Sequence, residues 1–286
     1  MKKSESKYLI YYLSLIGFLA IFSTTISKNP VLSLFTNYLG ANAAIVGLIA
    51  AISPLAGIIF SFPIGFLSDK IGRRKILLAS GFIFMLAPLL YLLVDNPWQL
   101  IPIRFFHGMA TALLGPIASA IIAERYFKSK GAKLGIYSSA TLIGRTLAPI
   151  LGGAILSFFI FYQEIIQYKL VYVVAFSIGL LVFILTLFYH ENKSIKNSSK
   201  SFKESLSAFI KNSKMRSTAL IEMAIYFAFG AFETYLPLFL QLKGFSAYHA
   251  GIIFALQTLS IALSKPLFGK LADKIDKRIQ IGRAHV

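Results

Sequence analysis

Acidic residues are scarce in this sequence, and two of them stand inside long apolar stretches. Of 11 aspartates and glutamates, only Glu222 and Glu233 are placed in the interior of a predicted membrane span. Their spacing corresponds to about 20° around an α-helix and ~16 Å along it, so both face the same way. Removal from water raises the proton affinity of a carboxyl group, which makes the deeper Glu233 a candidate proton carrier. The alternatives are a fixed ion pair of Glu233 with Arg145 or Lys265, and an interfacial position for Glu222.

Two arginines also fall within apolar stretches. Arg104 is far from both ends of its stretch, and a charge at such a depth is costly and usually functional. It could tune a nearby acid or bind an anionic group of a ligand, and the alternative is a structural hydrogen bond to neighbouring backbone. Arg145 could line a cavity, or it could extend its side chain to the membrane surface.

Other kinds of chemistry find no support in the residues. There is no cysteine, and the four histidines have no metal-ligand spacing, so we expect no metal and no cofactor. No convergent acid–base or nucleophile set is visible, so we expect no enzymatic activity. A net charge of +18 could indicate binding to nucleic acid. Most of the basic residues lie between the apolar stretches, however, which indicates that they face a membrane surface.

Composition and segment length predict an all-α polytopic membrane protein. Hydrophobic residues make up 57% of the chain and charged residues only 14%, against about 25% charged in soluble domains. The apolar residues come in blocks of about 20, the length that crosses a bilayer as a helix. We expect eight spans, at 8–27, 43–64, 76–94, 98–124, 134–161, 169–189, 216–240 and 247–268.

The basic residues predict the orientation of these spans. The N-terminus, the second and fourth connections, the central connection and the segment after the eighth span carry most of the 29 lysines and arginines. The opposite connections carry only Lys28, Lys169 and Lys243. Positive loops stay in the cytoplasm, so we expect a plasma-membrane protein with a cytoplasmic N-terminus and a cytoplasmic central connection.

A loop motif occurs twice, after the second and the eighth span. Gly65-Phe-Leu-Ser-Asp-Lys-Ile-Gly-Arg-Arg reappears in weaker form as Gly269-Lys-Leu-Ala-Asp-Lys-Ile. Internal repeats of this sort are typical of secondary transporters. In the first copy, Gly65 and Gly72 permit close helix approach and a tight turn. Asp69 is a lone acid among basic residues and can pair with them, so the loop could latch two lobes together in one state. The alternative is a positive anchor that only sets orientation.

Three motifs in order resemble those of the major facilitator superfamily. The first is the loop just described. Arg104-Phe-Phe-His107-Gly resembles the R-x-x-q-G motif, and 144–153, Gly-Arg-Thr-Leu-Ala-Pro-Ile-Leu-Gly-Gly, resembles the G-x-x-x-G-P-x-x-G-G motif of the drug/proton antiporters. The resemblance covers about 8–280. One departure is that the first span has no acid, whereas many proton-coupled members carry one there.

The resemblance implies a secondary transporter that works by alternating access. The leading expectation is proton-coupled efflux of small organic molecules by a monomer in the lipid bilayer. The runner-up is an uptake symporter for a metabolite or organic anion, and a non-transporting sensor is a distant alternative. The expected site residues are a gating loop (Gly65, Asp69, Lys70, Gly72, Arg73, Arg74, Asp273), a proton and substrate pathway (Arg104, Arg145, Glu222, Glu233) and helix-packing positions (Gly144, Ala148, Pro149, Gly152, Gly153).

The expected organisation is a complete six-span lobe followed by part of a second. We place the first lobe at 1–189, a cytoplasmic linker at 190–215 and two spans of the second lobe at 216–280. The family has twelve spans, so we expect a longer parent protein and an inactive fragment. Residues 281–286, Ile-Gly-Arg-Ala-His-Val, back-translate to a common sequencing-library adapter followed by a stop codon, so we expect that they are not encoded by the gene.

Long reads across this locus test the last expectation. We expect an open reading frame that departs from this sequence near 281 and continues through further spans. A stop codon directly after Val286 in clean genomic sequence would contradict it.

Overall fold

The structure is a computed structural model and describes residues 2–190, 207 and 210–272. Throughout this part of the chain the regular elements are helices. The long ones are α1 (Lys2–Ile26), α2 (Val31–Tyr38), α3 (Ala43–Ile71), α4 (Arg73–Tyr91), α5 (Leu100–Arg125), α6 (Lys130–Phe158), α7 (Glu164–Phe188), α9 (Ser213–Leu242) and α10 (Ala247–Ala272); two short 3-10 helices are η1 (Pro97–Gln99) and η2 (Phe127–Ser129). Asp273, residues 281–286 and most of the predicted linker lie outside the described residues.

Eight segments of the described chain are long and apolar enough to cross a membrane. This agrees with the eight predicted spans, although several boundaries were wrong. α1 ends at Ile26, next to the predicted boundary Lys28-Asn29-Pro30, but the apolar segment continues to Tyr38 because the short helix α2, which was not predicted, begins directly after Pro30. Proline lacks a backbone N–H and is tolerated where a helix starts. The chain is therefore bent at this point and continues as helix.

The connection predicted between the second and third spans is reduced to one residue. α3 continues to Ile71 and α4 starts at Arg73, so Asp69 and Lys70 lie in the last helical turn. Gly72 between the two helices has φ +95°, a conformation that glycine adopts without strain. The charged residues extend the helices beyond their apolar part, which is why the apolar pattern placed the boundaries too early.

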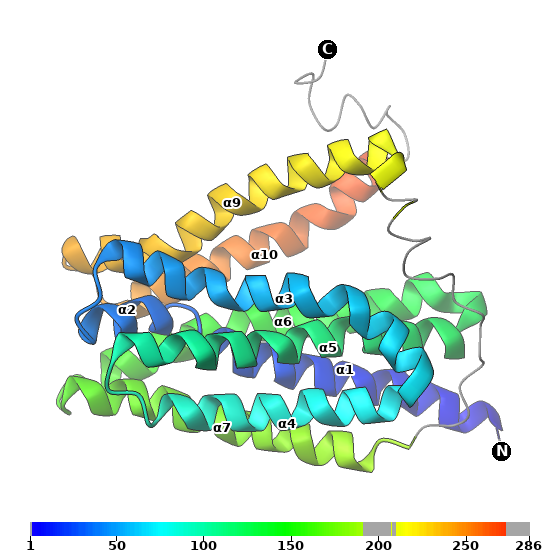
Figure 1. Cartoon of the computed structure of the whole chain (residues 1–286), viewed down its shortest axis with the longest axis horizontal. Coiled ribbons are helices and arrows are strands. Elements are labelled where there is room, and N and C mark those ends of the chain that lie inside the picture. Colours follow the sequence, from blue (N-terminus) through cyan, green and yellow to red (C-terminus); the bar gives the residue numbers. More distant parts are fainter. Residues whose placement is uncertain (1, 191–206, 208–209, 273–286) are drawn as a thin grey trace.

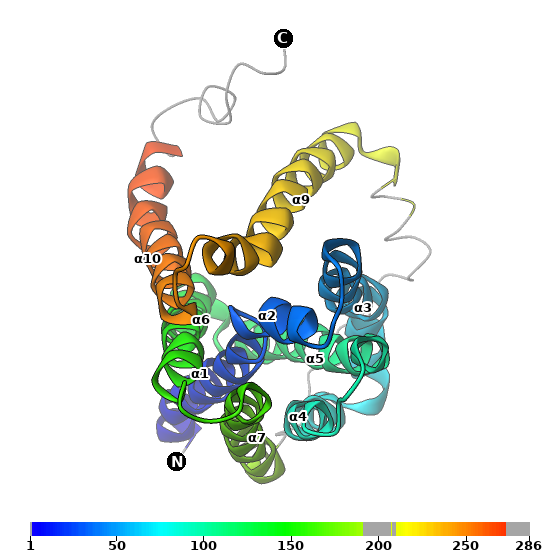
Figure 2. The same cartoon turned by 90° about the vertical axis from the view of Figure 1, so that its left-hand side faces the viewer.

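The helices run roughly parallel to one another, with their connections at two ends (Figure 1). One end, which we call the basic end, carries the start of α1, the α3–α4 junction and η2. The other, which we call the neutral end, carries α2 and the α6–α7 and α9–α10 connections. Figure 2, seen along the bundle from the neutral end, shows α1 and α3–α7 grouped together, with α9 and α10 on one side of this group.

Two buried clusters hold the α1–α7 group together. One lies among α1, α3, α4, α5 and α7 and contains Leu77, Phe84 and Ile117. The other lies closer to the neutral end and joins α1, α2, α4 and α7 through Phe35, Tyr91 and Tyr172. Close approach of the backbones is possible because small residues stand at the crossings. A Cβ on Gly179 of α7, for example, would collide with the Phe84 carbonyl of α4.

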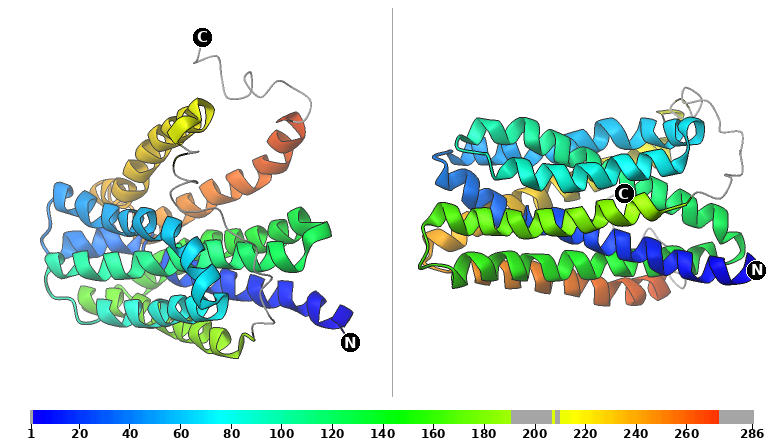
Figure 3. Two further views of the ribbon diagram at one scale, coloured as in Figure 1. Left: turned by 45° about the vertical axis from the view of Figure 1, so that its right-hand side comes forward. Right: turned by 90° about the horizontal axis from the view of Figure 1, so that it is seen from below.

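α9 and α10 meet the α1–α7 group mainly in the half of the molecule nearest the neutral end. Toward the basic end both helices diverge from the group (Figures 1 and 3). The exposures agree, because Leu220, Met223 and Phe227 in the first half of α9 are 61–82% exposed, whereas Thr234 and Leu240 in its second half are 9% and 8% exposed. The two parts of the chain therefore touch at one end.

Gly179→Val is predicted to lower the apparent melting temperature of the purified protein. The added atoms collide with the α4 backbone, and overpacking of this kind costs about 1–3 kcal/mol. Thermal unfolding followed by light scattering measures the change. Gly57→Val is the matched control, since a Cβ on Gly57 in α3 meets nothing within 4 Å. Equal melting temperatures for the two variants would contradict the prediction.

Candidate functional site

The first group of candidate residues lies at the basic end, around the guanidinium of Arg73. Its Nη2 donates to Oδ1 of Asp69 at 2.9 Å, its Nη1 to Oγ of Ser68 at 3.1 Å and its Nε to Oε1 of Glu124 at 3.1 Å. Arg73 is 8% exposed as a whole. We call these four residues the Arg73 cluster. They tie the α3–α4 junction to the last turn of α5.

The pairing of Asp69 with a neighbouring basic residue agrees with the predicted chemistry of the loop. Glu124 was missed, because it stands at the very end of its apolar stretch and the sequence gives no reason to join two segments 51 positions apart. Of the other loop residues, Lys70 is exposed and Arg74 donates to the Leu187 carbonyl at 3.3 Å. The close helix approach predicted at Gly65 is not found, since a Cβ there meets nothing within 4 Å.

The second group lies toward the neutral end and joins α9 to the α1–α2 bend. Oε2 of Glu233 lies 2.6 Å from Nζ of Lys28, and Oε1 accepts a hydrogen bond from Nδ2 of Asn29 at 2.9 Å. The Glu233 side chain is 17% exposed and that of Lys28 is 31% exposed. We call this the Glu233 contact. Its partner was predicted wrongly among the described residues: it is Lys28 and not Arg145, while the side chain of Lys265 lies outside the described residues.

Further contacts between α9 or α10 and the rest of the chain lie in the same half of the molecule. The Tyr235 hydroxyl donates to the Ala43 carbonyl at 3.0 Å, and the Tyr248 backbone N–H donates to Oγ of Ser157 at 3.0 Å. α6 and α10 cross closely, because a Cβ on Gly153 would meet the Ala247 carbonyl.

The small residues of α6 divide between two neighbours. A Cβ on Gly144 would meet the Phe18 backbone of α1, and one on Gly152 would meet Ile26 and Val31. The Pro149 carbonyl faces Gly251 of α10, and Ala148 is fully buried. The predicted packing motif thus supports contacts on both sides of α6.

Arg104 lies inside the α1–α7 group and not beside Glu233. It is 2% exposed and interacts with Tyr91, whose hydroxyl is 3.5 Å from Nδ1 of His107. Tyr91 stacks on Tyr172 with ring centroids 4.5 Å apart. Within the described chain, Arg104 Nε, His107 Nε2 and the Tyr172 hydroxyl are buried without a hydrogen-bond partner. Arg104 is therefore held among aromatic rings of α4, α5 and α7.

The remaining pathway candidates are exposed. Arg145 is exposed and stands one helical turn before Pro149 on α6. Glu222 lies in the exposed first half of α9. Neither residue forms an ion pair within the described chain.

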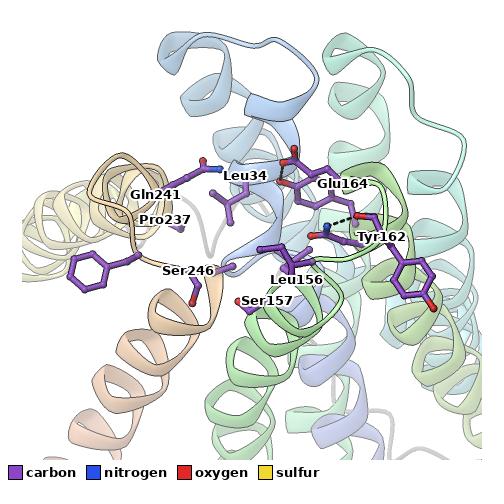
Figure 4. A pocket seen from close by; sticks show the side chains of 13 residues that line it. Leu34, Leu156, Ser157, Tyr162, Glu164, Pro237, Gln241 and Ser246 are labelled. Atoms are coloured by element: carbon purple, nitrogen blue, oxygen red, sulfur yellow. Dashed lines mark hydrogen bonds between the residues drawn. The ribbon is translucent and has the colours of Figure 1, made fainter.

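A cavity of about 410 Å³ lies near the neutral end, between α2, α6 and α7 on one side and α9 and α10 on the other. Figure 4 shows the lining side chains between these elements, with the ring of Tyr162 directed away from the others. Its lining mixes apolar and polar groups: Leu34, Leu156, Ser157, Ile160, Tyr162, Glu164, Gln167, Tyr168, Pro237, Gln241, Phe245, Ser246 and Ala247. None of these residues was a candidate in the sequence analysis, because they come from five segments that only the fold brings together.

Residues 13–285 match the Major Facilitator Superfamily. The chain belongs to this family. It is 26% identical over 256 residues to an uncharacterized MFS-type transporter of Methanocaldococcus jannaschii, with 86% of this chain and 64% of that protein aligned. It is 30% identical over 266 residues to the multidrug resistance protein MdtG of Citrobacter koseri, covering 86% of the chain and 62% of the relative. The chain thus spans less than two thirds of these relatives.

Solved structures of the superfamily share the fold. A bacterial homologue of the human lysosomal transporter Spinster, in an inward-facing conformation, superimposes with a TM-score of 0.78 at 22% identity, over 96% of this chain and 64% of that one. A D-xylose–proton symporter gives 0.67 at 15% identity, over 93% and 69%. The predicted major-facilitator-type fold and the predicted membership of the superfamily are confirmed.

Glu124→Ala is predicted to destabilise the superfamily member more than Asp69→Ala. Removal of Glu124 takes away the main carboxylate partner of the buried Arg73 guanidinium. The loss of such a partner costs about 3 kcal/mol. Asp69 is 34% exposed at its side chain, so its ion pair contributes about 1 kcal/mol or less. Thermal unfolding of both purified variants gives the comparison. A larger effect of Asp69→Ala would contradict it.

Proposed function

We propose that this chain is the larger part of a plasma-membrane exporter that exchanges protons for small organic molecules by alternating access. The observation that carries the proposal is the Glu233 contact, in which an acid of α9 is bound to Lys28 and Asn29 of the opposite part of the molecule. It is a charged contact between two parts of the chain that touch at one end, and it can be broken by a single proton.

The distribution of contacts supports alternating access. Contacts of α9 and α10 with the α1–α7 group gather toward the neutral end, and the first half of α9 is exposed. With the basic end in the cytoplasm, as the positive-inside rule predicts, this is a conformation closed to the outside and open to the inside. Rocking of one part against the other then requires that the Glu233 contact separates.

The same contact supplies a place for proton exchange. When the outer end is open, Glu233 takes up a proton from outside and no longer carries the charge that attracts Lys28. When the outer end closes, the proton leaves toward the inside and the carboxylate pairs again with Lys28 Nζ. The proton is thereby carried inward while the substrate moves outward. Glu233 fills this role without an acid in the first span.

The Arg73 cluster at the basic end is proposed to hold the α3–α4 junction against α5; it lies within the α1–α7 group and does not join the two parts of the molecule. Its charges hold α3, α4 and α5 in one arrangement, and the exposed Lys70 and the half-buried Arg74 stand beside it. The relatives named as multidrug resistance proteins support export over uptake.

Glu233→Gln in the longer parent protein is predicted to abolish pH-driven transport in proteoliposomes. Glutamine keeps the size of the side chain but cannot exchange a proton. Substrate counterflow without a pH gradient should continue, since it needs only the conformational change. Glu222→Gln, at an exposed position of the same helix, is the control and should transport normally. Unchanged pH-driven transport by Glu233→Gln would remove Glu233 as the proton carrier, and uptake driven by an inward proton gradient would favour the symporter.

Spin labels test the latch separately from transport. The chain contains no cysteine, so Tyr38→Cys and Leu242→Cys place one label on each side of the neutral end; these positions are 41% and 85% exposed. Lys28→Ala and Glu233→Gln should both increase the population with a longer label distance. Distance distributions identical to those of the unchanged protein would contradict the latch.

A further inference from the structure

The cavity near the neutral end is not part of the Glu233 contact, although it lies close to it. Pro237 and Gln241, which line it, stand one and two helical turns beyond Glu233 toward the neutral end of α9, at about 6 and 12 Å along the axis. The cavity therefore lies on the outer side of the contact. It remains present in a conformation in which the contact is closed.

The lining of the cavity has one charged residue and several aromatic faces. Glu164 is the charged member, and neither Lys169 nor Lys243 belongs to the lining. The Tyr168 hydroxyl donates to Oε1 of Glu164 at 3.0 Å. Oε2 has no hydrogen bond or ion pair within the described chain. The carboxylate is thus positioned by one partner and keeps an oxygen for a ligand (Figure 4).

The polar groups of the lining are held in place by neighbouring residues. Gln167 is 8% exposed, and its Nε2 donates to the Tyr162 carbonyl at 3.0 Å, which fixes the start of α7 beside the end of α6. Tyr168 is 3% exposed and lies against Phe35 with ring centroids 5.1 Å apart. The wall that carries Glu164 is therefore rigid, whereas α9 and α10 form the opposite wall.

We propose that this cavity is a binding site for an organic cation with an aromatic or apolar body. The Glu164 carboxylate attracts the positive charge of such a ligand, and the lining also includes the aromatic residues Tyr168 and Phe245. Leu34, Leu156 and Pro237 accommodate the apolar part. An anion finds no positive group in the lining. A cavity of about 410 Å³ falls within the range of small-molecule sites.

The position of the site gives it a place on the export route, a point that rests on the proposed function. A substrate that has passed the Glu233 contact reaches this cavity next, between the same two parts of the molecule. Binding there would hold a released cation outside the closed contact. The site itself does not depend on proton coupling, since none of its lining residues belongs to the Glu233 contact.

Binding of tetraphenylphosphonium to the purified chain in nanodiscs tests the site. We expect saturable binding that Glu164→Gln weakens about fivefold, the effect of losing one partly exposed ion pair. Tetraphenylborate has the same shape and the opposite charge, and Glu164→Gln should leave its binding unchanged or strengthen it. Gln241→Trp, which fills the cavity and keeps the carboxylate, should weaken binding of the cation as well. Asp95→Asn, at an exposed acid outside the lining of the cavity, is the control and should bind as the unchanged chain does.

The binding measured for each variant decides whether the cavity is a cation site. Equal cation binding by Glu164→Gln and the unchanged chain would overturn the proposal, as would Gln241→Trp without effect. A loss of melting temperature in Glu164→Gln would show misfolding, and binding by Gln241→Trp then decides whether the cavity holds the cation. These measurements report binding and not transport. If Glu233→Gln loses pH-driven transport but binds the cation normally, the proton-carrier role of Glu233 and the cation site are separate properties.

Discussion

The hydrocarbon interior of a membrane offers no partners to backbone N–H and C=O groups, and this constraint governs the whole structure. Helices satisfy these groups within one segment, which is why the described chain is built from them. Lipid tails are as apolar as the side chains between helices, so association depends on close packing. The glycines that let α4 approach α7 and α6 approach α10 follow from this requirement.

In the same low-dielectric surroundings, a charged side chain is costly unless it has a partner. Arg73 is buried with Ser68, Asp69 and Glu124 around it, and Glu233 is held by Lys28 and Asn29. Both groups join segments that are distant in sequence, one near each end of the bundle. A buried charge that loses its partner is expensive, so such contacts favour two discrete arrangements over a continuous range. That property is what a protein with two alternating states requires.

Arg104, unlike Arg73, is buried without a carboxylate partner among the described residues. It is buried within the α1–α7 group, beside Tyr91, His107 and Tyr172. Three polar atoms of this cluster are buried without partners among the described residues. Arg145, by contrast, is exposed on α6. Of the two arginines, only Arg104 is buried.

The sequence by itself determined the eight spans, the family and the positions of its motifs, because apolar length, charge placement and residue spacing are local properties. It also predicted a tight turn at Gly72, which has φ +95° between α3 and α4. Only the tertiary structure decided which charges meet. Glu233 pairs with Lys28 across 205 positions, Arg73 with Glu124 across 51, and Glu164 lines a cavity with Gln241. Those pairings depend on how the helices cross and rotate, and no local pattern encodes the angle at which two helices pack.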